Sequence, residues 1–183
     1  MNIQNPNNIF VFDMDNTLIK TDKANNLAYS EAISMVLGIK CAIDSNNRFT
    51  RKGLRELFPS LKKNQIEEII ACKERCFESY LKETELNQNL FRLLKQLHSE
   101  GHHTILLTNC HSGRAISLCN YYHLTNYFVQ RFFYEDCFDN KYNLLKSLGY
   151  DLQNVVYFEN EEDASSEAVA NGVNFEKIIK VDF

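Results

Sequence analysis

A short apolar run that stops on two carboxylates constrains the fold of this chain most. Residues 9–12 read Ile-Phe-Val-Phe, and Asp13 and Asp15 follow directly. Four β-branched and aromatic residues in a row predict a strand buried on both faces, as in the middle of a parallel sheet. Asp13 then lies at the carboxyl end of that strand, where open parallel sheets bind their ligands.

The same two carboxylates indicate a cation. Asp13 and Asp15 would repel each other unless a positive charge lay between them, and Mg2+ with oxygen ligands commonly supplies it. An Asp-rich turn without any metal is the alternative, because Asp and Asn are common turn residues. From this motif alone, both interpretations stay open.

Composition excludes several classes of function. A chain of 183 residues has room for one core, or for a core and a small appendage. The net charge of −4 gives no reason to expect nucleic acid or an anionic membrane as a partner. No apolar run approaches the roughly 20 residues of a membrane span, and the first eight residues do not resemble a signal peptide. We therefore expect a cytoplasmic protein.

The cysteines and histidines do not predict zinc. Six cysteines include no C-x-x-C pair. His98 and His102 have H-x-x-x-H spacing, but the predicted helix ends at Gly101 between them, so they do not share one helix face. Cys72 and Cys76 lie four residues apart on a predicted helix, but no matching pair of ligands occurs elsewhere. We expect them to be reduced thiols rather than metal ligands.

Hydrophobic periodicity divides the chain into two parts. Between residues 20 and 86 it predicts only helices. These are a helix over 22–37 ended by Gly38, a short helix through Leu54 to Phe58 ended by Pro59, and a long helix from a capping box at Asn64 and Glu67 to Thr84. Elsewhere strands and helices alternate. The strands are expected at 9–12, 103–107, about 127–134, 154–158 and 177–181, and the helices at 89–99, 112–119, 140–148 and 163–171.

This alternation predicts an α/β fold with a doubly wound parallel sheet. The expected domains are an α/β core of residues 1–19 and 87–183 and an inserted all-helical domain of residues 20–86. Three of the strands end on groups that suit phosphate chemistry. They are Asp13 and Asp15 after the first strand, Thr108 and Asn109 after the second, and Glu159 after the third, with Lys141 opening a helix between the last two. Strand ends share one edge of a parallel sheet, so these groups should converge.

These motifs follow one another along the chain as D-x-D-x-T, then T-N, then Lys, then an acidic residue. In this order they resemble the motifs of the haloacid dehalogenase superfamily of phosphotransferases, and the resemblance covers nearly the whole chain. The helical insert resembles the small cap of the subgroup that includes phosphoglycolate phosphatase and β-phosphoglucomutase. The resemblance implies a Mg2+-dependent phosphatase that hydrolyses a small phosphomonoester through an aspartyl-phosphate. Its expected partner is a small phosphorylated metabolite, with no nucleic acid and no membrane, and the protein is expected to be a monomer or homodimer.

The resemblance also implies roles for residues. Asp13 corresponds to the nucleophile and Asp15 to the general acid and base. Thr108, Asn109 and Thr17 are assigned to phosphate or substrate binding, and Lys141 offsets negative charge. Mg2+ would be held by the Asp13 carboxylate, the main-chain carbonyl of Asp15 and Glu159. Asn160 stands where a second carboxylate is usual, so one charge is missing unless Asp163, which also suits a helix N-cap, contributes.

Several alternatives share these residues. A haloalkanoate dehalogenase has no use for an acid at the position of Asp15, so the presence of Asp15 favours a phosphate ester over a haloalkanoate as substrate. A phosphonate hydrolase needs a Schiff-base lysine from the cap, and Lys20 and Lys23 are close enough in sequence to serve. A phosphomutase has the same core residues. Because Asn160 replaces the usual carboxylate, a family member that binds phosphorylated ligands without turnover is a further alternative. A receiver-type signalling module lacks a helical insert after its first strand.

The insert also predicts substrate specificity. Arg48 and Arg51 flank a polar loop, and guanidinium groups match carboxylate or phosphate through paired hydrogen bonds. We therefore expect a small anionic phosphate ester as substrate, such as a phosphorylated sugar or organic acid. Replacing either arginine with Ala should raise KM for that substrate and leave hydrolysis of an uncharged aryl phosphate almost unchanged. An equal loss on both substrates would contradict the assignment to specificity.

Overall fold

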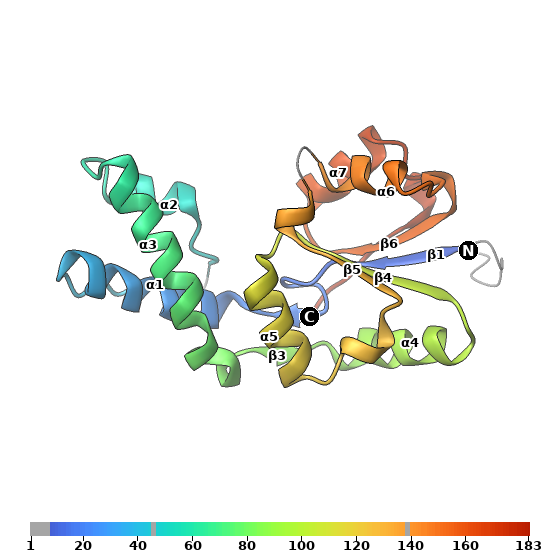
Figure 1. Cartoon of the computed structure of the whole chain (residues 1–183), viewed down its shortest axis with the longest axis horizontal. Coiled ribbons are helices and arrows are strands. Elements are labelled where there is room, and N and C mark those ends of the chain that lie inside the picture. Colours follow the sequence, from blue (N-terminus) through green and yellow to red (C-terminus); the bar gives the residue numbers. More distant parts are fainter. Residues whose placement is uncertain (1–7, 45–46, 138–139) are drawn as a thin grey trace. The chain divides into compact units, whose positions relative to one another are not determined.

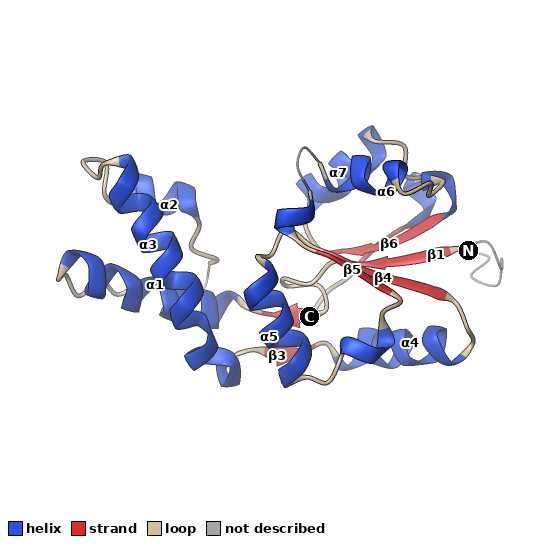
Figure 2. Ribbon diagram, viewed as in Figure 1, coloured by secondary structure: helices blue, strands red, loops and turns tan. Residues whose placement is uncertain are grey.

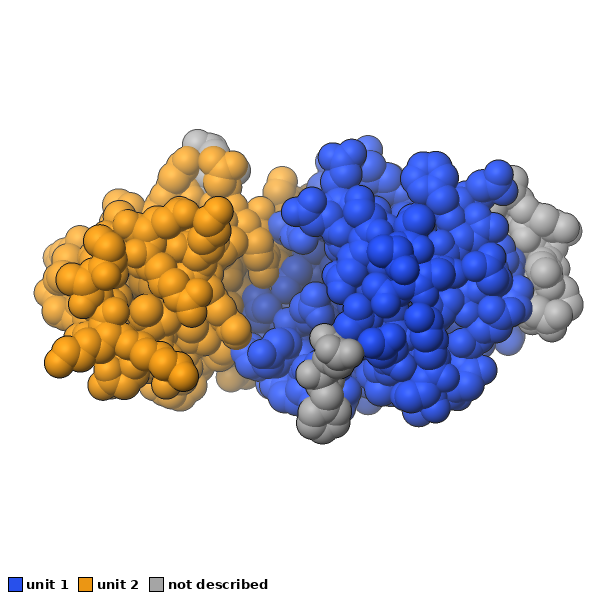
Figure 3. Space-filling model, turned by 90° about the horizontal axis from the view of Figure 1, so that it is seen from above, with its two compact units in different colours: residues 1–19, 86–183 blue, residues 20–85 orange. Residues whose placement is uncertain are grey.

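The computed structural model describes residues 8–44, 47–137 and 140–183. The chain forms two compact units (Figure 3), and each has its own core. Unit 1 combines Met1–Ile19 with Leu86–Phe183, and unit 2 is the continuous segment Lys20–Glu85. Two short strands, β2 (Ile19–Lys20) and β3 (Glu85–Leu86), pair with each other where the chain leaves unit 1 and returns to it.

Unit 1 is built on a five-stranded parallel sheet with the strand order β5-β4-β1-β6-β7 (Figures 1 and 2). The predicted α/β class with a parallel sheet is confirmed. The first strand of the chain is the middle strand of the sheet, which explains its uninterrupted apolar sequence. The strands are β1 (Ile9–Phe12), β4 (His103–Leu107), β5 (Gln130–Phe132), β6 (Val155–Glu159) and β7 (Ile178–Lys180).

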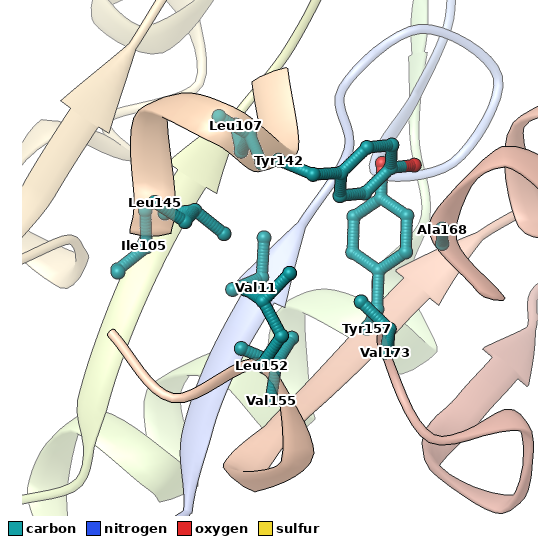
Figure 4. Packing of buried hydrophobic residues seen from close by; sticks show 10 residues of the cluster. All are labelled: Val11, Ile105, Leu107, Tyr142, Leu145, Leu152, Val155, Tyr157, Ala168 and Val173. Carbon is teal, nitrogen blue, oxygen red and sulfur yellow. The ribbon is translucent and has the colours of Figure 1, made fainter. Parts of the chain in front are cut away.

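Helices cover both faces of this sheet, α4 and α5 on one side and α6 and α7 on the other (Figure 1). Alternate residues of β1 serve the two faces, because side chains alternate along a strand. Phe12 stacks on Phe158 and meets Phe128 edge-on. Val11 points to the other face, into the cluster drawn in Figure 4. That cluster consists of Val11, Ile105, Leu107, Tyr142, Leu145, Leu152, Val155, Tyr157, Ala168 and Val173.

The helices of unit 1 lie close to their predicted positions. Asn87 and Asn140 accept main-chain N–H groups as the N-caps of α4 and α6. The predicted N-cap role of Asp163 is wrong, because Glu161 is the N-cap residue and Asp163 lies inside the first turn of α7. The α-helices are α4 (Gln88–Ser99), α5 (Ser112–Tyr121), α6 (Lys141–Ser147) and α7 (Glu162–Ala170). In the part of unit 1 that the structure describes, the 3-10 helices are η2 (Thr125–Tyr127), η3 (Tyr134–Asp136), η4 (Leu152–Asn154) and η5 (Phe175–Lys177).

Unit 2 is helical, with α1 (Asp22–Leu37), α2 (Arg51–Leu57), α3 (Lys63–Cys76) and the 3-10 helix η1 (Phe77–Glu83). Gly38 ends α1 in the left-handed conformation that its position requires, with φ at 69°. The long helix predicted from Asn64 to Thr84 is wrong at both ends: Lys62 is the N-cap residue, and the chain tightens into η1 after Cys76. The core of the unit consists of Tyr29, Ala32, Ile33, Leu54, Ile66, Ile69 and Cys72.

No helix within the described ranges is both long enough and apolar enough to cross a membrane.

Candidate active site

The carboxyl edge of the sheet gathers the predicted groups. Phe12 of β1 pairs with Leu106 of β4 and with Phe158 of β6. Asp13 is therefore level with Glu159, and its main-chain N–H donates to the Phe158 carbonyl at 3.1 Å. Thr108 follows β4 at the same edge and is buried. The Thr108 hydroxyl oxygen accepts the N–H of Cys110 at 3.2 Å and so shapes the turn after β4.

Lys141 joins the two carboxylates. It is the first residue of α6, and its side chain is almost fully buried. Its Nζ lies 3.8 Å from Asp13 Oδ1 and 3.5 Å from Glu159 Oε2. The structure thus brings Asp13 together with Lys141 and Glu159, although more than a hundred residues of sequence separate Asp13 from the other two.

The environment of Asp13 disfavours its negative charge. Burial raises the pKa of the Asp13 carboxyl well above its ordinary value, Lys141 lowers it, and nearby Glu159, Asp15 and Glu161 raise it further. Lys141 contacts two of these carboxyl groups, those of Asp13 and Glu159, and it offsets the cost of burying the Asp13 charge only in part. A second positive charge at this position would relieve the repulsion.

Tyr157 is a site residue that the sequence did not reveal. It lies on β6 two residues before Glu159, so both side chains point to the same face. Its buried hydroxyl donates to Glu159 Oε2 at 2.9 Å and accepts from Lys141 Nζ. Its ring stands edge-on to that of Tyr142, inside the cluster of Figure 4. In the sequence it looks like any aromatic residue of a buried strand.

Glu159 has few acceptor positions left. A carboxylate offers about four lone-pair sites. Oε1 accepts the N–H groups of Asn160 and Glu161 at 2.9 and 3.0 Å, and Oε2 accepts from Tyr157 and Lys141. The 3.5 Å contact with Lys141 is the longest of the four, so it is the one that a metal ion would displace most easily.

A tight turn carries Asp15 and Thr17 back over the strand end. The Met14 carbonyl accepts the N–H groups of Thr17, Leu18 and Ile19, and Asn16 takes a left-handed φ of 58°. The Thr17 hydroxyl is buried and donates to the Asn160 side-chain oxygen at 3.0 Å. Asn160, the departure from the usual carboxylate, thus ties the turn after β1 to the turn after β6.

Arg114 is the second site residue that the sequence did not reveal. It lies on α5, is buried, and donates from Nη2 to Asp15 Oδ2 at 3.1 Å. The side chains of Arg114 and Asp15 are only 6% and 17% exposed, so water screens this pair weakly. Arg114 follows the T-N motif by several residues, and an arginine in the first turn of a predicted helix normally indicates a solvated side chain.

Of the other predicted site residues, two belong to unit 1 and two to unit 2. In unit 1, Asn109 is exposed after β4, and Asp163 is exposed on α7. In unit 2, Arg48 donates to Thr21 Oγ1 and Asp22 Oδ1, both at 2.9 Å, and Arg51 is exposed at the start of α2.

The two candidate Schiff-base lysines are also in unit 2 or at its edge. Lys20 is exposed, and Lys23 pairs with Glu83 at 2.6 Å.

The donor set fits a hard divalent cation. Among the described residues, no three His, Cys, Asp or Glu side chains are grouped as a metal cluster. The predicted set needs fewer side chains: the Asp13 carboxylate, one lone pair of Glu159 and the main-chain carbonyl of Asp15, with waters completing the shell. The excess of carboxyl groups around the buried Asp13 is the observation that favours such an ion.

A doubly wound parallel sheet with carboxylates and a hydroxyl at the ends of its central strands, and a buried lysine at the start of α6, defines a Rossmann-like α/β protein. The model of the haloacid dehalogenase-like hydrolase family matches residues 10–178. The chain therefore belongs to the haloacid dehalogenase-like hydrolase family, as its motifs predicted. A search of curated proteins gave no significant match.

Solved structures share the fold at low sequence identity. CbbY from Rhodobacter sphaeroides in complex with phosphate is 18% identical, with a TM-score of 0.72 over 96% of this chain and 86% of that one. A Lactobacillus plantarum protein assigned as a phosphoglycolate phosphatase is also 18% identical, with a TM-score of 0.73 over 91% and 83%. A Thermotoga maritima protein assigned as a β-phosphoglucomutase is 19% identical, with a TM-score of 0.66 over 94% and 84%. These likenesses establish the fold.

Proposed function

We propose that this hydrolase is a Mg2+-dependent phosphatase that cleaves a small phosphomonoester through an aspartyl-phosphate on Asp13. The observation that carries the proposal is the buried contact of Asp13 with Lys141 at the carboxyl edge of the sheet, with Asp15 held beside it by Arg114. A nucleophilic carboxylate must meet an anionic substrate, and the lysine supplies positive charge where the two negative groups approach.

The reaction divides between the two aspartates. In the first step, an Asp13 oxygen forms a bond to phosphorus while the bond from phosphorus to the alcohol oxygen breaks, and Asp15 gives that oxygen a proton. In the second step, Asp15 takes a proton from water as the water oxygen attacks phosphorus. Phosphate leaves, and Asp13 is restored. Thr108 and main-chain N–H groups of the strand-end turns would hold the phosphoryl oxygens.

Lys141 keeps the nucleophile in place throughout. Its ammonium group lies between Asp13 and Glu159, and the Tyr157 hydroxyl fixes it from a third side. Mg2+ on Asp13, Glu159 and the Asp15 carbonyl would supply further charge neutralisation for the phosphoryl group. Asn160 contributes no charge, so we expect weaker metal binding than a site with two adjacent carboxylates would show.

Mg2+ dependence is the first test. Purified protein should release phosphate from p-nitrophenyl phosphate in the presence of Mg2+ and lose this activity after EDTA treatment, because the crowded carboxylates then lack a counter-charge. Returning Mg2+ should restore the rate, measured as p-nitrophenolate release. A rate that is independent of EDTA would contradict a metal role. Binding of inorganic phosphate without any turnover would instead favour the ligand-binding alternative.

Arg114 provides a test of the acid and base role of Asp15. Arg114→Gln should lower kcat by up to about a hundredfold, the lower range of what a general acid or base contributes. The loss should be larger for phenyl phosphate than for p-nitrophenyl phosphate, since the poorer leaving group needs the proton more. Arg114→Lys should recover part of the rate. The exposed Arg92→Gln serves as control, and equal losses on both substrates would indicate only a structural role.

The structural neighbours support a phosphorylated ligand without selecting one. CbbY has been solved with phosphate and, as a variant, with xylulose-1,5-bisphosphate. We propose a small anionic phosphate ester as the substrate of this protein, because Arg48 and Arg51 of unit 2 could bind a second anionic group. Arg48→Ala would also remove its ion pair with Asp22, so Arg51→Ala should be measured beside it as a second test of specificity. A phosphomutase would use the same core residues, and return of the phosphoryl group to substrate, rather than phosphate release, would identify it.

A further inference from the structure

Unit 2 contains three sulfur atoms from two helices in an almost regular triangle. Cys72 and Cys76 lie one turn apart on α3, and Met35 lies near the end of α1. Each thiol sulfur is 3.8 Å from the Met35 sulfur, and the two thiol sulfurs are 3.9 Å apart. Neither cysteine belongs to a disulfide. The sequence showed only a pair of thiols without further ligands, because Met35 is far away in the chain.

The size of this triangle matches a metal ion at its centre. A point equidistant from corners separated by 3.8, 3.8 and 3.9 Å lies about 2.2 Å from each of them. Metal–sulfur bonds in proteins are about 2.3 Å long, as at zinc. The sulfurs would therefore need to move very little to bind one ion in a trigonal plane.

The donor atoms select the kind of metal. Thiolate and thioether sulfur are soft ligands that favour Cu(I), whereas zinc prefers four ligands from Cys, His and carboxylates. Cys72 is buried, Cys76 is half-buried, and Met35 is 66% exposed. A metal ion could thus enter from the Met35 side while the two thiols anchor it. We propose that Cys72, Cys76 and Met35 form a trigonal Cu(I) site in unit 2, independent of the phosphatase activity proposed for unit 1.

Binding would exchange protons for metal. Cu+ would form bonds to both cysteine sulfurs, whose protons pass to solvent, and to the Met35 lone pair, which releases none. Two protons should therefore appear in solution for each copper ion bound, with no change in the oxidation state of any group.

The test is competition for copper under anaerobic, reducing conditions. The full-length protein is titrated into Cu(I) held as its bicinchoninate complex, and loss of the complex colour reports transfer. We expect one tightly bound Cu(I) per chain. Met35→Leu and Cys76→Ser should each weaken binding by at least about tenfold, the loss that even an outer-shell change causes at metal sites. Cys41→Ser and Cys137→Ser, which remove thiols outside the triangle, should bind as the wild type does.

X-ray absorption at the copper edge supplies a second readout on the wild-type protein. Three sulfur neighbours at about 2.2–2.3 Å are expected. No transfer of copper from the chelator to the wild-type protein would overturn the proposal, as would nitrogen or oxygen neighbours in the absorption spectrum. Unchanged affinity in Met35→Leu would also overturn it. That variant is suited to the purpose because an exposed methionine can be replaced by leucine without harm to the fold.

Discussion

An Asp13→Asn variant should lose turnover of p-nitrophenyl phosphate by at least about a thousandfold, a loss in the range found when a catalytic nucleophile is removed. The amide cannot form the bond to phosphorus on which the reaction depends. The measurement is steady-state phosphate release with saturating Mg2+. Asp151→Asn is the matched control: Asp151 accepts the N–H of Gln153 before β6, an asparagine there keeps this acceptor, and the position is at the opposite edge of the sheet.

Loss of activity in Asp13→Asn should not come from unfolding. Burial and neighbouring carboxyl groups penalise the charge of Asp13 in the folded protein. The neutral amide removes that penalty, so thermal unfolding of the variant should occur at the same temperature as in the wild type or higher. A variant that keeps near wild-type activity would show that another residue is the nucleophile.

Lys141→Met should produce the largest loss of stability of any single change at the site. Removing one partner of a buried ion pair leaves an uncompensated charge and typically costs about 3–5 kcal/mol. Here the ammonium group serves both Asp13 and Glu159. The free energy of unfolding, measured with urea at neutral pH, should fall by this amount. Lys146→Met changes an exposed residue of the same helix and should have almost no effect.

The loss should depend on pH in a defined direction. The pKa of Asp13 is already raised in the folded state, and Lys141 is the group that lowers it. Without the lysine this pKa rises further, so the folded protein loses stability as pH increases through it. The difference between Lys141→Met and wild type should be largest at neutral pH and shrink as pH falls toward about 4, the ordinary range of an Asp carboxyl. A difference that grows on acidification would contradict the assigned pairing.

Much of unit 1 could be predicted because its signals are local. The apolar runs of β1, β4 and β6 identify buried strands, and strand ends in a parallel sheet must share an edge. This reasoning was sufficient to predict that Asp13 and Glu159 converge, and the family resemblance added Lys141 to them. The end of α3 could not be predicted in the same way. The apolar periodicity continues past Cys76 into η1, and only the observed main-chain hydrogen bonds distinguish a 3-10 helix from an α-helix there.

The residues that support the site could not be predicted, because their roles depend on distant contacts. Arg114 looks like a surface arginine until α5 places it against Asp15, 99 residues earlier in the chain. Tyr157 looks like a core residue until its hydroxyl reaches Lys141 and Glu159. In the sequence, Asn160 indicates only that a carboxylate is missing. In the structure its side-chain oxygen accepts a hydrogen bond from the Thr17 hydroxyl and so connects two turns. The chemical roles of these residues stay predictions until the variants are measured.

The placement of β1 in the middle of the sheet has a consequence for how the chain folds during synthesis. The ribosome makes β1 first, but both of its neighbours, β4 and β6, come from the second half of the chain. Unit 2 is continuous and complete once Glu85 has emerged. A nascent chain can therefore finish its helical unit while the apolar strand that carries Asp13 still has no partners. Strand pairing across such long sequence separations is slow. An apolar strand that is exposed before its partners are made favours aggregation. Asp13 thus leaves the ribosome before β4 and β6, and its surroundings are complete only when β6 has followed.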